Sequence, residues 1–180
     1  MFGARDPAWR ADVARVGAPR AFLKEQSLWA IWVYRFGRRV DRRPAGLRRR
    51  MLLGVYWFLF RIAETLTGIS LPKSCVIGKG LRIWHFGGIF INASTVIGEN
   101  CTLRHGVTIG DRHEDGAAPV LGDHVELGAC AQILGGVHIG NHCKIGAMTL
   151  VLTDMPPGST AVGIPARVVA LPPPAIIRKA

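Results

Sequence analysis

Cysteines are few in this 180-residue sequence, and they are far apart. No two of them form a CxxC pair; the four are Cys75, Cys101, Cys130 and Cys143. Closely spaced cysteine pairs mark structural zinc sites, and dense cysteine patterns mark the disulfide frameworks of small secreted domains. The spacing therefore predicts no zinc site and no disulfide framework, and it favours reduced thiols in a cytoplasmic protein.

Long hydrophobic runs are also missing. The strongest, MLLGVYWFLF at 51–60, has ten residues, whereas a helix needs about 20 apolar residues to cross a bilayer. The N-terminal stretch MFGARDPAWRADVARVG has no apolar core of the kind that a secretory signal peptide requires. We expect a cytoplasmic protein that consists of one domain, or of one domain with a helical appendage.

Acidic residues are scarce: 12 Asp and Glu stand against 23 Lys and Arg, a formal net charge of +11. Most of the excess of basic residues lies at 1–70, which has 14 basic and 5 acidic residues (+9). Residues 71–180 have 9 basic and 7 acidic residues (+2). No motif that reads nucleic acid accompanies it, so we expect no nucleic-acid partner. The segment LRRRMLLGVYWFLF at 47–60 is either a surface that contacts anionic lipid or a packing helix flanked by solvated arginines.

The N-terminal region has the periodicity of helices. In AFLKEQSLWAIWVYRFGRRV, which starts at Ala21, apolar side chains recur at three- and four-residue spacing. The run LRRRMLLGVYWFLFRIAETL, which starts at Leu47, predicts a second helix, and Pro44 and Gly46 separate the two. We expect helices from about 21 to 66, within a helical segment over 1–70.

A six-residue repeat dominates the rest of the chain. From 91 to 151, aliphatic residues fill ten of eleven positions on one grid, and the empty position falls at Asp115 inside DRHEDGAAP. The ten are Ile91, Ile97, Leu103, Ile109, Leu121, Leu127, Ile133, Ile139, Ile145 and Val151. An earlier set, Ile77, Ile83 and Ile89, is also six apart but offset by two.

Hexapeptide periodicity is typical of a parallel β-helix, in which each repeat forms one flat face and its aliphatic side chain points inward. Three hexapeptides close one coil, so 75–154 predict about four coils, with an external loop at about 110–120. Such a stack buries each coil against its neighbours and needs a cap, which the helices can provide. We expect the β-helix over 71–170 and a C-terminal tail over 171–180.

Several segments form recognisable motifs: WHFGGIFI (84–91), VTIGDRH (107–113), LGACAQILGGVHIGNHCKIGA (127–147), PPGSTAVGIPARVV (156–169) and, in the helical segment, YRFGR (34–38). Together they resemble the serine acetyltransferase family of hexapeptide-repeat acyltransferases. The resemblance implies a mainly β fold, a left-handed parallel β-helix with an N-terminal α-helical segment. It also implies acetyl-CoA as co-substrate, no metal, and a homotrimer or a dimer of trimers, with the coenzyme pocket between neighbouring β-helices.

One histidine of these motifs stands directly before two glycines. The resemblance implies that this residue, His85, is the general base that removes the proton of an acceptor hydroxyl. Histidine suits the role because its unperturbed pKa of about 6.5 leaves it neutral at cytoplasmic pH, and positioned bases contribute about 10²–10⁴-fold. Gly87 and Gly88 would let acceptor and backbone approach the ring. The alternative is a buried histidine satisfied by a neighbouring carbonyl.

By residue match, small side chains would flank the pantetheine arm of the coenzyme, and two basic residues are candidates for its phosphates. The small residues are Gly128, Ala129, Gly146 and Ala147, and the basic residues are Lys144 and Arg167. The turn geometry of a β-helix explains the small residues equally well, and Lys144 equally suits a solvated turn.

Two positions depart from the family pattern and leave the acceptor open. The family has an aspartate fifteen residues before the base, where this chain has Ser70, and an acidic residue just before the base, where it has Trp84. An indole suits stacking on a sugar face. Serine and a sugar of a surface polysaccharide or its precursor are therefore both candidate acceptors.

Four residues are candidate acceptor contacts. Trp84 stands next to the base, and Arg112 and His113 match the Asp-Arg-His motif whose Arg and His hold the amino-acid substrate in the family. His105 lies twenty residues after His85, close to one coil length, so we expect it near the same edge. For His113 the alternative is a solvent-facing loop residue.

Two other classes of function compete with acetyl transfer. A zinc hydratase of the β-helix type needs three histidines that converge across an interface, and its histidine pair four residues apart with acidic neighbours is missing here. A non-catalytic scaffold or a membrane-surface module would use the arginine-rich helices.

Overall fold

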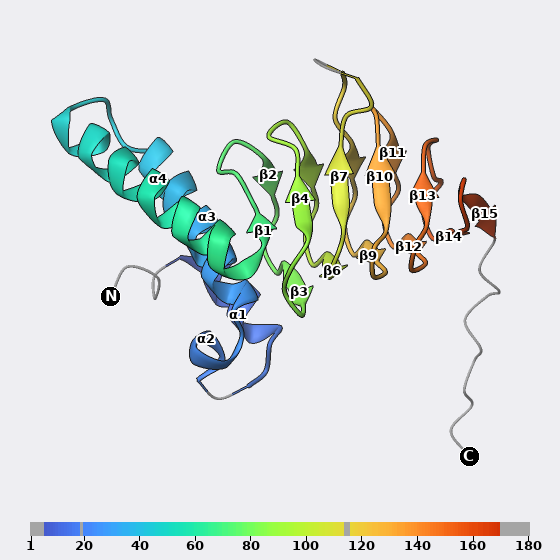
Figure 1. The fold of residues 1–180 in the computed structure, drawn as a ribbon, viewed down its shortest axis with the longest axis horizontal. Helices are drawn as coiled ribbons and strands as arrows, with labels where there is room; N and C mark the ends of the chain where they lie inside the picture. Colours follow the sequence, from blue (N-terminus) through green and yellow to red (C-terminus); the bar gives the residue numbers. More distant parts are fainter. Residues whose placement is uncertain (1–5, 19, 114–115, 170–180) are drawn as a thin grey trace.

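The computed structural model describes residues 6–18, 20–113 and 116–169. A group of helices lies at one end of a prism of short strands (Figure 1). The helices are α1 (Pro7–Ala14), α2 (Ala21–Lys24), α3 (Ser27–Asp41) and α4 (Leu47–Thr67). The helices expected at about 21–66 correspond to α2, α3 and α4, whereas α1 lies outside the predicted helices.

Three sheets form the faces of the prism. Sheet A contains, in order, β1 (Ile69–Ser70), β4 (Ile89–Ile91), β7 (Thr108–Gly110), β10 (Gln132–Leu134) and β13 (Leu150–Val151). Sheet B contains β2 (Val76–Ile77), β5 (Val96–Ile97), β8 (Val120–Leu121) and β11 (His138–Ile139). Sheet C contains β3 (Arg82–Trp84), β6 (Thr102–Arg104), β9 (Glu126–Leu127), β12 (Lys144–Ile145), β14 (Thr160–Val162) and β15 (Arg167–Val169). Because successive strands enter successive sheets, the predicted parallel β-helix with an N-terminal helical segment is confirmed.

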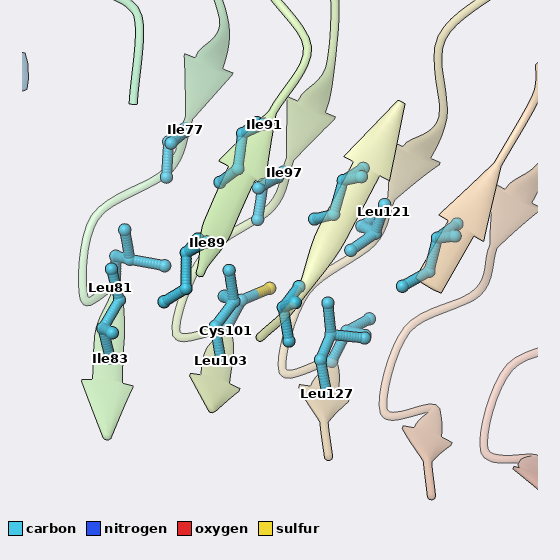
Figure 2. Packing of buried hydrophobic residues seen from close by; sticks show 14 of the residues in the cluster. Ile77, Leu81, Ile83, Ile89, Ile91, Ile97, Cys101, Leu103, Leu121 and Leu127 are labelled. Carbon is cyan, nitrogen blue, oxygen red and sulfur yellow. The ribbon is translucent and has the colours of Figure 1, made fainter. Parts of the chain in front are cut away.

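The aliphatic residues of the six-residue grids form the core of the prism. Every one of them is buried, and none is more than 6% exposed. Figure 2 shows the labelled members of this set, from Ile77 to Leu127, with their side chains in the space between the sheets, where residues of successive coils lie in rows. The inward position of each hexapeptide therefore needs an aliphatic side chain, and this need is the physical origin of the repeat.

Strand pairing shows where a coil is longer than three hexapeptides. Leu127 pairs with Ile145, 18 residues on, whereas Ile83 pairs with Leu103, 20 residues on. The two additional residues lie in the corner at 84–89, between β3 and β4. The two sequence grids are therefore offset by two residues because this corner is two residues longer than the corners of a regular coil.

The helical segment caps the first coil through buried side chains of α3. The Tyr34 hydroxyl accepts a hydrogen bond from the Ile77 N–H at 2.9 Å and donates one to the Cys75 carbonyl at 3.1 Å. The Arg35 guanidinium donates to the carbonyls of Ile77, at 2.8 Å, and Gly78, at 2.6 Å. These bonds satisfy backbone groups at the end of the stack, which a solenoid must otherwise leave to water.

The β-helix is slightly longer than the repeat predicts. It begins at Ile69, two residues before the expected boundary, and the five strands of sheet A correspond to about five coils. At the far end, β15 pairs antiparallel with β14. The predicted tail at 171–180 lies outside the described residues. No described helix has the length and apolar character that crossing a membrane requires.

Candidate active site

His85 lies in the corner between β3 and β4, and its side chain is exposed. The backbone there is left-handed, with φ of 68° at His85, 99° at Gly87 and 66° at Gly88. Glycine adopts this conformation freely, and histidine is among the residues that tolerate it. A Cβ on Gly88 would lie 3.3 Å from the Cα atom of Gly106 in the next coil. The lengthened corner thus presents the imidazole at the surface, which excludes a histidine sealed in the core.

His105 occupies the corresponding corner of the following coil. Trp84 and Arg104 are register partners, so the histidines that follow them lie one above the other. Their ring centroids are 5.8 Å apart in an edge-to-face arrangement. The twenty-residue spacing in the sequence equals the length of this coil. Ser70, at the position of the family aspartate, lies in β1, and its register partner is Phe90 in β4, the strand that follows the His85 corner.

A cavity of about 310 Å³ opens beside His85, between the helical segment and the corner. It is lined by Lys24, Glu25, Gln26, Ser27, Trp84, His85 and Phe86. The Ser27 hydroxyl donates to the Ile83 carbonyl at 3.2 Å, which joins the start of α3 to β3. Of the lining residues, Glu25 alone carries a carboxylate. The cavity therefore brings an imidazole, an indole and an acidic group together.

A buried arginine connects two walls of this cavity. The guanidinium carbon of Arg82 lies 4.2 Å from the centroid of the Trp84 ring, and its Nη2 atom lies 3.6 Å from Oε1 of Glu25. Arg82 is 4% exposed, and its Nε and Nη1 atoms have no hydrogen-bond partner within the described chain. A buried charge requires a counter-charge. Arg82 therefore holds the Glu25 carboxylate close to the indole.

A groove of about 540 Å³ runs across the outer face of sheet C, over β3, β6, β9 and β12 and the corners that follow β9 and β12. Its lining includes the predicted coenzyme residues Gly128, Ala129, Lys144, Gly146 and Ala147, together with Trp84. Trp84 thus lines both the groove and the cavity that holds His85. The two spaces therefore lie next to the same indole.

Coil stacking explains one of the small residues independently of any ligand. A Cβ on Gly128 would lie 2.5 Å from the backbone nitrogen of Ala147 in the next coil. The basic candidates differ in position. The Lys144 ammonium lies on the groove, 3.8 Å from a Glu126 carboxylate oxygen. Arg167 lies in β15, opposite Val162, and is not among the residues that line the groove.

Arg112 and His113 lie away from His85 within one chain. They belong to the connection from sheet A to sheet B, whereas His85 lies on the edge between sheets C and A (Figure 1). Both line a second groove, of about 380 Å³, and an Arg112 nitrogen donates to the Leu152 carbonyl at 3.3 Å. One subunit therefore does not bring these predicted acceptor residues to the base.

The sequence reasoning missed several residues of both spaces. Glu25 and its neighbours come from the α2–α3 connection, about sixty residues before His85, and no local pattern marks them. In the groove, Thr102 and Glu126 are register partners of one another, and Glu126 is the partner of Lys144. Counting coil lengths from Lys144 would have identified this outward-facing column.

The zinc-hydratase alternative would require a metal site, and the part of the chain that the structure describes holds no candidate for one. There, no three His, Cys, Asp or Glu side chains are grouped so that they could hold an ion. The histidines at 124 and 142 stack on one another, with ring centroids 4.7 Å apart, as an exposed pair away from the cavity.

Comparisons with known proteins agree with this architecture. The model of the bacterial transferase hexapeptide family (six repeats) matches residues 118–153. Serine acetyltransferase of Helicobacter pylori is 39% identical over 125 residues, which cover 68% of this chain and 73% of the relative. Serine acetyltransferase of Bacillus subtilis is 32% identical over 166 residues, 91% of this chain and 73% of the relative.

Solved structures give the same result over the helical segment and the β-helix. The soybean serine acetyltransferase apoenzyme has a TM-score of 0.78 at 32% identity, with 91% of this chain and 70% of that chain covered. The Neisseria gonorrhoeae serine acetyltransferase in complex with serine has a TM-score of 0.77 at 30% identity, covering 91% and 68%. These relatives do not favour the sugar acetyltransferase alternative. The chain belongs to the serine acetyltransferase family of hexapeptide-repeat acyltransferases, and it is an acetyl-CoA-dependent O-acetyltransferase.

Proposed function

We propose that this enzyme transfers the acetyl group of acetyl-CoA to the hydroxyl of L-serine, with His85 as the general base. One observation carries the proposal: Trp84 lines both the groove along sheet C and the cavity that holds the His85 ring. A thioester in the groove and an alcohol in the cavity would therefore meet at this imidazole. The names of the relatives support serine as the alcohol.

In the proposed reaction, a neutral nitrogen of the His85 ring accepts the proton of the acceptor hydroxyl as the oxygen attacks the thioester carbonyl. The tetrahedral intermediate carries a negative oxygen, which backbone N–H groups of the opened corner at Gly87 and Gly88 can stabilise. When the intermediate collapses, the C–S bond breaks and the proton passes from the imidazolium to the leaving thiolate. The products are the acetyl ester and free coenzyme A, and His85 returns to its neutral form.

For the coenzyme, we propose the groove along sheet C. Ala129 and Ala147 leave room for the pantetheine arm, and the Lys144 ammonium can pair with a phosphate in place of Glu126, 3.8 Å away. Arg167, in β15 at the end of the same sheet, is the second candidate for the phosphates. No metal takes part in this proposal.

For the acceptor, we propose that the Glu25 carboxylate receives the ammonium group of the amino acid. The acidic residue that the family places before the base is Trp84 here, and Glu25 supplies a negative charge in the same cavity. His105, 5.8 Å from His85 between ring centroids, is a further contact at this edge. A neutral sugar has no ammonium group, so this carboxylate favours serine over neutral sugars.

We also propose that the active unit is a homotrimer in the cytoplasm, alone or paired as a dimer of trimers. The groove is open on its outer side, and a neighbouring β-helix would supply the missing wall. In such a ring, Arg112 and His113 of one subunit can face the His85 corner of the next. The four cysteines are unbridged, as expected of thiols in a reducing compartment.

An acceptor panel tests the proposal. The purified enzyme is given acetyl-CoA with L-serine, L-threonine, glycerol or a series of sugars, and thiol release is measured together with the mass of the acetylated product. We expect L-serine to give a kcat/KM at least a hundredfold above every sugar. Faster acetylation of a sugar than of L-serine would refute serine as the acceptor.

A further inference from the structure

One face of α4 carries exposed apolar side chains along its whole length. The six residues follow one another at spacings of four, four, three, four and four, so they form a single stripe on the helix. They are Leu47, Met51, Val55, Phe58, Ile62 and Leu66, and their exposed fractions are 75%, 66%, 47%, 67%, 41% and 61%. We call this set the α4 stripe.

The α4 stripe is separate from the face that α4 uses within the fold. Tyr56, Phe60 and Ala63 of α4 are buried in a cluster with side chains of α3. Figure 1 shows α4 beside α3 and extending away from the β-helix, so the prism does not cover it. A soluble monomer rarely leaves so continuous an apolar surface in water. The stripe therefore needs a partner.

Positive charge surrounds the stripe. Between residues 38 and 50 the chain has seven arginines and one aspartate, a surplus of +6. On α4 itself, Arg48 and Arg50 are exposed in the first turn. Arg61 is exposed three turns after Arg50, and Trp57 is half exposed between them. An apolar stripe bordered by arginines and an indole is typical of a helix that lies in a membrane interface.

We propose that the α4 stripe docks this enzyme onto an anionic lipid surface, with the helix parallel to the membrane. The apolar side chains would enter the acyl region while the arginines contact lipid phosphates. A second copy of the chain fits this face less well, because it would cover the apolar side chains but bring almost no counter-charge for the arginines: Glu64 is the one acidic residue of α4, and it already pairs with Arg61 at 2.9 Å. A nucleic acid would use the arginines but leave the apolar stripe in water.

The test measures how the full-length protein partitions onto sedimented vesicles. We expect binding to vesicles with one third phosphatidylglycerol, weaker binding in 0.5 M salt, and little binding to pure phosphatidylcholine. Phe58→Glu should lower the partition coefficient at least tenfold. The double variant Arg48→Gln, Arg50→Gln should lower it by roughly fivefold per arginine. Both variants should keep the oligomer mass and the rate of thiol release of the parent protein.

Leu23→Glu is the matched control, because Leu23 is 74% exposed but lies on α2, outside the stripe. It should bind anionic vesicles as the parent does. Equal binding by Phe58→Glu and the parent would refute the proposal. The proposal would also be refuted if the parent bound no vesicles and Phe58→Glu halved the mass of the oligomer. That result would assign the stripe to contact with a second copy. Binding to duplex DNA without vesicle binding would likewise refute it.

Discussion

At the scale of single residues, burial decides the chemistry of several ionisable side chains. Burial raises the pKa of the Cys75 thiol from 9.0 to about 12 and that of Cys101 to about 11. The same cause raises the pKa values of Tyr34 and Tyr56 from 10.0 to about 12. These groups stay neutral in the folded protein at a pH at which they ionise in the unfolded chain.

This difference predicts a loss of stability at alkaline pH. Below about pH 9 these groups are protonated in both states, and their contribution to the free energy of unfolding is fully present. It is lost as the pH rises toward 12, because unfolding then releases protons. Urea unfolding at pH 7, 9 and 10.5, followed by circular dichroism, should show a falling free energy of unfolding. The variant Cys75→Ala, Cys101→Ala should fall less steeply. A free energy that stays constant over this range in the parent would contradict the prediction.

Part of the candidate site could be predicted from residue identities alone. The motif around His85 and the match at Gly128 and Lys144 identified residues that line the cavity and the groove, which share Trp84. The carboxylate of Glu25 and the guanidinium of Arg82 could not be found this way, because the cavity forms only when the α2–α3 connection packs on β3. Contacts between segments sixty residues apart leave no local pattern.

At the scale of elements, a buried ion pair attaches α1 to the cap. Two nitrogens of Arg35, on α3, contact the two carboxylate oxygens of Asp12, on α1, at 2.8 Å and 3.0 Å. The Leu81 N–H donates to the same carboxylate at 2.8 Å. Asp12 is fully buried and Arg35 is 5% exposed. The pair therefore joins both helices to the first coil of the β-helix.

Removing one partner should be costly. Asp12→Ala leaves the Arg35 guanidinium buried without its counter-charge, so we expect a loss of about 3–5 kcal/mol in the free energy of unfolding. The double variant Asp12→Leu, Arg35→Met should recover much of that loss, because it removes both charges and keeps the volume. Guanidinium chloride unfolding measures all three proteins. A loss below about 1 kcal/mol in Asp12→Ala would show that the pair does not hold α1.

The two kinds of element differed in how well the sequence predicted them. The strands follow from the six-residue grid because each inward position faces a single chemical requirement, an aliphatic side chain in the prism. The short helix α1 has no comparable signal. It begins where the Asp6 carboxylate accepts hydrogen bonds from the N–H groups of Ala8 and Trp9. It is then fixed by the buried Asp12, and such tertiary contacts do not appear as periodicity.

At the scale of the whole molecule, the proposed trimer would bring together residues that one chain keeps apart. His85 lies on the edge between sheets C and A, and the connection that carries Arg112 and His113 leaves sheet A for sheet B. A count of coil lengths would not reveal such a contact, since the spacing relates positions within one prism only.

Mixed trimers test the shared site. One variant carries His85→Asn, and the other carries Arg112→Ala and His113→Ala. If each site combines the histidine of one subunit with the loop of the next, random co-assembly restores roughly one quarter of the sites. Thiol release by co-expressed, differently tagged subunits measures this recovery. If mixed trimers are no more active than either variant alone, His85 and the Arg112–His113 loop do not form a site shared between subunits.

The measurement closest to the central claim replaces the proposed base without disturbing the corner. His85→Asn suits this purpose, because asparagine tolerates the φ of 68° at this position. His124→Asn is the matched control, since His124 is exposed, has φ of 57°, and lies away from the cavity. With saturating acetyl-CoA and L-serine, kcat should fall at least a hundredfold in His85→Asn and stay unchanged in His124→Asn, while both bind coenzyme A as the parent does. A His85→Asn enzyme that keeps its turnover would contradict the account.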